Sequence, residues 1–134
     1  MNLKLVGALS LFGLAMGIAT IFAIPPNVEP FFWLAIFVFC AVVIARRQPS
    51  RPFAHGLLTS IANSVWITAA HSIFFERYVA GHPREASMMV NAPLDGRVMM
   101  LLTGPVIGVV SGLVLGLFAV VASKLVNPAA APGR

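Results

Sequence analysis

The sequence has little that could hold a fold together by covalent or ionic bonds. It contains one cysteine, Cys40, so no intrachain disulfide can form. Charged residues make up only 10% of its 134 residues, and four of these are acidic. Hydrophobic residues make up 59%. This balance excludes an ordinary water-soluble domain and is typical of integral membrane proteins.

No acidic residue lies in the interior of a long apolar stretch of the sequence. A proton-coupled carrier usually needs a carboxylate deep inside the membrane, so the sequence does not favour this class of transporter. The net charge of +5 does not predict nucleic-acid binding either. The basic residues flank the apolar stretches, where they act as topology signals and contact anionic lipid.

The apolar stretches predict an all-α membrane protein with four transmembrane helices in a compact bundle. The predicted spans are residues 3–24, 31–45, 53–76 and 98–124. A helix of about 20 residues crosses the hydrocarbon core of a bilayer. All four belong to one domain, residues 1–126, and residues 127–134 are predicted to be a disordered cytoplasmic tail. Pro83 is suited to begin a short surface helix between the third and fourth spans.

Glycines recur at helical spacing in two of the predicted spans. An interior glycine costs a soluble helix about 1 kcal/mol relative to alanine, but in a bilayer small residues let two helices approach closely. We therefore expect the first helix to pack on the glycine face of the last. Pro105 predicts a kink within a continuous last helix. The predicted helix-packing residues are Gly13, Gly17, Gly104, Gly108, Gly112 and Gly116.

Polar side chains gather on one face of the third predicted span. Their spacings of three and four residues place them along one side of a helix, which should point into the bundle rather than at lipid. This candidate polar site consists of Ser60, Asn63, Ser64, Thr68 and His71. Asn63 and His71 should find interhelical partners, for which the candidates are Ser10, Thr20 and Thr103.

The three histidines do not predict a metal or cofactor site. His55 and His71 are separated by roughly 160° around one helix, so a single ion cannot contact both. His82 lies in the outer loop and could approach His71 only through tertiary folding. His55 is interpreted as an interfacial residue and His71 as a hydrogen-bonding partner. No metal-binding or catalytic motif occurs, so we expect no metal, no cofactor and no intrinsic catalysis.

The distribution of charge predicts an orientation. Four spans place both termini on the same side of the membrane, and that side carries no acidic residue. Its basic residues are Lys4, Arg46, Arg47, Arg51, Lys124 and Arg134. The positive-inside rule therefore predicts that both termini are cytoplasmic, in a bacterial-type inner membrane.

These features predict a small inner-membrane accessory, scaffold or assembly subunit that acts through glycine-mediated helix packing. Its expected partners are the lipid bilayer and a second copy of the chain or a larger membrane complex, and not nucleic acid. The alternative is a small oligomeric transporter or channel that uses the polar face of the third helix, because polar intramembrane residues commonly mark transport pathways.

Overall fold

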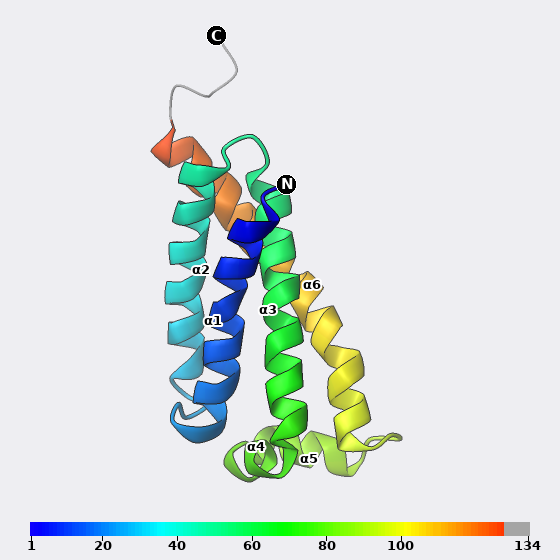
Figure 1. Ribbon diagram of the computed structural model, residues 1–134. Coiled ribbons are helices and arrows are strands. Elements are labelled where there is room, and N and C mark those ends of the chain that lie inside the picture. Colours follow the sequence, from blue (N-terminus) through cyan, green and yellow to red (C-terminus); the bar gives the residue numbers. More distant parts are fainter. Residues whose placement is uncertain (128–134) are drawn as a thin grey trace.

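The computed structural model describes residues 1–127, a range that contains six helices and no strand. The helices are α1 (Leu3–Phe22), α2 (Glu29–Arg47), α3 (Pro52–Ile73), α4 (Phe75–Gly81), α5 (Pro83–Val90) and α6 (Gly96–Val126). The four long helices run alongside one another, and α4 and α5 lie across one end of them (Figure 1). Apart from Asn127, the predicted disordered tail lies outside the described residues.

Three helices, α1, α2 and α6, are each long and apolar enough to cross a membrane. Four such helices were expected from the sequence. Helix α3 does not qualify alone because its hydroxyl, amide and imidazole side chains lower its hydropathy. It qualifies only together with α4, from which it is bent by 95°. The predicted span 53–76 therefore corresponds to a helix that ends at Ile73 and a change of direction after it.

The ends of the helices follow from local sequence. Proline occupies the first turn of α2, α3 and α5, where its missing N–H is not needed. The side chain of Asn2 accepts a hydrogen bond from the backbone N–H of Leu5 at 3.0 Å and begins α1. Asp95 begins α6 in the same way by accepting from the backbone N–H of Arg97 at 2.9 Å. Helix α6 is 31 residues long, and it is continuous through Pro105, as expected from the sequence.

Helix α3 lies between α1 and α6 and packs extensively against both, whereas α1 and α6 have almost no contact with each other. The expectation that the first helix packs on the glycine face of the last is therefore wrong. Both glycine stripes pack on α3 instead. The physical reason is that the polar helix requires an enclosing neighbour on each side.

Helix α2 completes the bundle by packing mainly on α6. It is the least buried of the three membrane-spanning candidates, and several of its large side chains, Phe31 and Leu34 among them, are exposed. Its buried face joins α1 and α6 in one apolar cluster. The members of this cluster are Leu9, Cys40, Ala41, Ile44, Leu115 and Ala119.

Two hydrogen bonds bring the N-terminus, the α2–α3 turn and the end of α6 together at one end of the bundle (Figure 1). The backbone N–H of Asn2 donates to His55 at 3.0 Å. The side-chain amide of Asn127 donates to the carbonyl of Ala45 at 2.9 Å. We call this the basic end, because the basic residues gather there without an acidic one: Lys4, Arg46, Arg47, Arg51 and Lys124.

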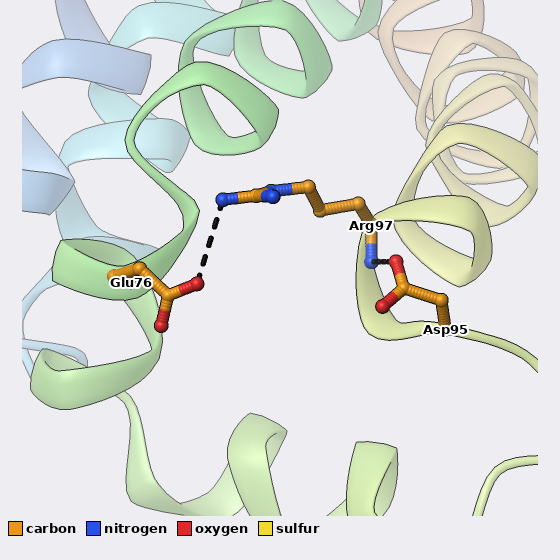
Figure 2. A network of polar contacts seen from close by, with 3 residues as sticks. All are labelled: Glu76, Asp95 and Arg97. Carbon is orange, nitrogen blue, oxygen red and sulfur yellow. Dashed lines mark hydrogen bonds and ion pairs between the residues drawn. The ribbon is translucent and has the colours of Figure 1, made fainter.

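The opposite end, which we call the α4–α5 end, carries charges of both signs. There Arg97 lies 3.4 Å from Glu76 and 5.1 Å from the ring centroid of Phe75, which links the start of α6 to α4. Figure 2 shows this pair with Asp95. The Arg97 and Glu76 side chains are 51% and 86% exposed, so the ion pair contributes little to stability.

The close packing of α1 on α3 predicts opposite effects for two alanine substitutions in one helix. A methyl group at Gly13 would lie 2.5 Å from Cα of Asn63, whereas one at Gly7 would meet nothing within 4 Å. We expect Gly13→Ala to lower the stability by roughly 1–3 kcal/mol, as overpacking does. Gly7→Ala should be neutral or stabilising. Thermal unfolding in mild detergent checks this, and equal melting of the two variants would contradict the packing.

Candidate functional site

The five residues of the candidate polar site are all buried, and they divide between two neighbouring helices. Asn63 and His71 contact α1. Ser60, Ser64 and Thr68 contact α6. Helix α3 thus presents its polar side chains to the two helices that enclose it.

Asn63 joins α3 to α1 at the point where α1 has a glycine. The backbone N–H of Gly13 donates to Oδ1 of Asn63 at 2.7 Å. The absence of a side chain at Gly13 is what allows this approach. Neither Ser10 nor Thr103, two of the partners expected from the sequence, bonds to Asn63. Ser10 accepts from the indole of Trp66 at 3.2 Å, and Thr103 donates to its own helix.

His71 joins α3 to α1 about two helical turns after Asn63. Its Nε2 lies 3.0 Å from the hydroxyl of Thr20, which is one of the partners expected from the sequence. The hydroxyl of Thr20 also donates to the carbonyl of Met16 at 2.9 Å. The hydrogen bond within α1 orients the Thr20 hydroxyl, and the oriented hydroxyl contacts the imidazole of His71 on α3.

Two further aromatic rings extend this contact in a stack that sequence reasoning missed. The ring of Tyr78 lies between those of His71 and His82, with both centroid separations at 4.1 Å. The bend between α3 and α4 turns Tyr78 back over His71. His82 is only 2% exposed, and its Nε2 has no partner in the described part of the chain. Burial and the negative charge of Glu85 raise the pKa of Tyr78 to about 12, so its phenol stays neutral.

The hydroxyl side chains of α3 fit against the glycines of α6. Ser64 lies against Gly108 and Thr68 lies against Gly104, so a methyl group at either glycine would collide with a hydroxyl. Ser60 donates to the hydroxyl of Ser111 at 3.2 Å. Gly112 and Gly116 meet larger side chains of α3. The whole stripe is therefore covered by α3 from within the same chain.

Two residues near the start of α3 also take part and were not assigned this role from the sequence. A methyl group at Gly56 would lie 2.7 Å from Cα of Gly116, so two glycines meet backbone to backbone. Its position one turn before Ser60 was the available signal. His55, interpreted from the sequence as an interfacial residue, is 1% exposed and lies inside the bundle. Its Nδ1 lies 2.8 Å from the carbonyl of Arg51.

A cavity of about 400 Å³ lies between α3, α5 and α6 at the α4–α5 end. Its surface is mainly apolar, and it includes four of the six methionines in the chain. These are Met88, Met89, Met99 and Met100. The polar side chains that line it are Ser64, Thr68, His71, Tyr78, Glu85 and Thr103. A cavity of this size, with apolar walls and few polar groups, has the form of a small-molecule site.

Residues 1–127 contain no group of three or more His, Cys, Asp or Glu side chains that could hold a metal ion. His71 and His82 do not meet, because the Tyr78 ring lies between them. Comparison of the chain with protein-family models, curated proteins and solved structures found no match. The function is therefore inferred from the arrangement of the helices and from the cavity.

The contact between α1 and α3 can be measured with a double-mutant cycle. We expect His71→Leu and Thr20→Val to be coupled by about 0.6 kcal/mol, the usual value for an interhelical hydrogen bond in membranes. Unfolding free energies of the two single variants and the double variant in detergent give this coupling. Strictly additive effects would show that the imidazole and the hydroxyl do not stabilise each other.

Proposed function

We propose that this protein is an accessory, scaffold or assembly subunit of the inner membrane without intrinsic catalysis. The observation that carries the proposal is that the polar side chains of α3 contact neighbouring helices of the same chain. The side chains of α3 that looked most suited to chemistry are engaged in contacts with α1 and α6. Such an arrangement produces a firmly packed bundle, which is what a scaffold requires.

In this proposal α3 is the fourth transmembrane helix. Its 22 residues extend about 33 Å, enough to cross the hydrocarbon core. It lies between α1 and α6, two helices apolar enough to span by themselves. Their enclosing surfaces cover its polar side chains, so its modest hydropathy does not prevent it from spanning. The change of direction after Ile73 then falls where the chain leaves the membrane.

The orientation proposed from the sequence agrees with the way the charges gather. The basic end holds only cations, whereas the α4–α5 end carries charges of both signs. By the positive-inside rule the basic end faces the cytoplasm, which makes both termini cytoplasmic. The α4–α5 end then lies on the outer side of the membrane.

In this proposal the surface offered to another subunit is the outward face of α6, the longest helix of the bundle. Because the glycine stripes are covered by α3, glycine-mediated packing serves the fold itself and not a second protein. The opposite face of α6 carries a long series of exposed branched side chains, which lipid or a partner helix can cover. Its members include Val106, Val109, Val110, Leu113, Val114 and Leu117.

A small transporter is the second candidate function, and one observation favours it. The cavity reaches from α5 to Ser64, Thr68 and His71, which belong to the polar face of α3. A site that joins one membrane surface to polar residues inside the bundle is the starting point of a transport pathway.

The proposed orientation predicts the accessibility of two serines. In a Cys40→Ala background, Ser87→Cys in α5 should react with an impermeant thiol reagent in intact cells. Ser50→Cys in the α2–α3 turn should react only after the cells are opened. Both serines are exposed, so they form a matched pair. Labelling of Ser50→Cys in intact cells would reverse the orientation.

The scaffold proposal predicts assembly through α6. In mild detergent, the protein mass measured by light scattering should exceed the 14.2 kDa of one chain. We expect Val110→Trp to weaken this assembly, because it changes the outward face of α6. Val65→Trp on α3 is the control, since the two valines are 58% and 59% exposed. A wild-type protein that is monomeric after gentle extraction would contradict the proposal.

A further inference from the structure

We infer that the cavity at the α4–α5 end binds a lipophilic cation, a small molecule with an apolar body and one positive charge. This inference goes beyond the scaffold role and does not depend on it, because it uses only the cavity and its lining. Three features of the lining carry it: the methionines, one carboxylate, and the position of the polar groups.

The methionines fit the cavity to an apolar body of variable shape. Four methionine side chains from α5 and α6 line it, together with Ile67 and Ile107. Methionine is unbranched and polarisable, so it adapts to different ligands and makes favourable contacts with aromatic rings. A wall of this kind suits an organic molecule better than a single small ion, given a volume of about 400 Å³.

The charge of the ligand follows from Glu85, which among residues 1–127 is the only charged side chain that lines the cavity. Glu85 is partly buried on α5, and no ion pair holds it in the part of the chain that the structure describes. Of the arginines at this end, Arg97 is paired with Glu76, Arg77 lies over the ring of Phe22, and Arg84 is exposed. A carboxylate beside apolar walls attracts a cation more strongly than one in water.

The positions of the polar groups along the cavity predict how the ligand is oriented in it. Glu85 belongs to α5 at the end of the bundle, whereas Ser64 and Thr68 lie further along α3 toward its middle. The cationic group therefore sits near the membrane surface, and the apolar body extends between α3 and α6. The hydroxyl oxygens of Ser64 and Thr68 at the inner end can accept a hydrogen bond from the body of the ligand.

Binding of tetraphenylphosphonium to the purified full-length protein in a neutral detergent tests this inference. Equilibrium dialysis should detect saturable binding, and Glu85→Gln should weaken it at least tenfold. Glu29→Gln is the matched control, because Glu29 lies in the first turn of α2, holds no arginine within residues 1–127 and does not line the cavity. It should bind as the wild type does. Equal affinities of Glu85→Gln and the wild type would overturn the inference.

Three further measurements test whether the cavity recognises charge, whether the cation binds inside it, and whether lipid competes for it. Neutral triphenylphosphine oxide should bind at least tenfold more weakly than the cation, and equal binding would show that the cavity selects by shape alone. Ala92→Trp, which fills the cavity from the turn before α6, should abolish binding of the cation. Binding that disappears in phosphatidylethanolamine nanodiscs would show that lipid occupies the cavity, and would also overturn the inference.

Discussion

The burial of one polar helix within apolar surroundings is the constraint on which the rest of this structure depends. Helix α3 carries an amide, an imidazole and several hydroxyls, and an unpartnered group of this kind costs on the order of several kcal/mol in hydrocarbon. Helices α1 and α6 lower that cost by enclosing α3, although Nδ2 of Asn63 and the hydroxyls of Thr59 and Ser72 have no hydrogen-bond partner within residues 1–127. Glycines on both of them bring the backbones near enough for the polar contacts to form.

The glycines of α1 and α6 and the polar side chains of α3 therefore depend on each other. Gly13 permits the hydrogen bond from its own N–H to Asn63, and Gly104 and Gly108 provide the space into which Thr68 and Ser64 fit. Larger residues at these positions would separate the helices and leave the polar groups without partners. Interhelical hydrogen bonds contribute only about 0.6 kcal/mol each, so the avoided penalty matters more than the bonds themselves.

The sequence predicted the all-helical membrane protein, the glycine stripes and the polar face, because each depends on residue spacing within a single helix. It did not predict which helices would pack together, since the spacing of Gly13 and Gly108 does not indicate that both face α3. The stack of His71, Tyr78 and His82 depends on the 95° bend after Ile73, and no pattern within α3 or α4 encodes that angle. The cavity likewise depends on where α5 comes to lie.

The two ends of the bundle differ in the side chains around their hollows, and this difference bears on function. Towards the basic end, a groove of about 390 Å³ between α2 and α6 is lined by apolar side chains without a methionine, and Ile44, Leu115 and Ala119 at the same junction are fully buried. At the α4–α5 end, methionines surround open space and two short helices connect the long ones. Close-packed residues transmit strain, whereas methionine side chains adapt to what they contact. Any response to a ligand is therefore expected at the α4–α5 end, while the packing around Leu115 keeps the long helices in place.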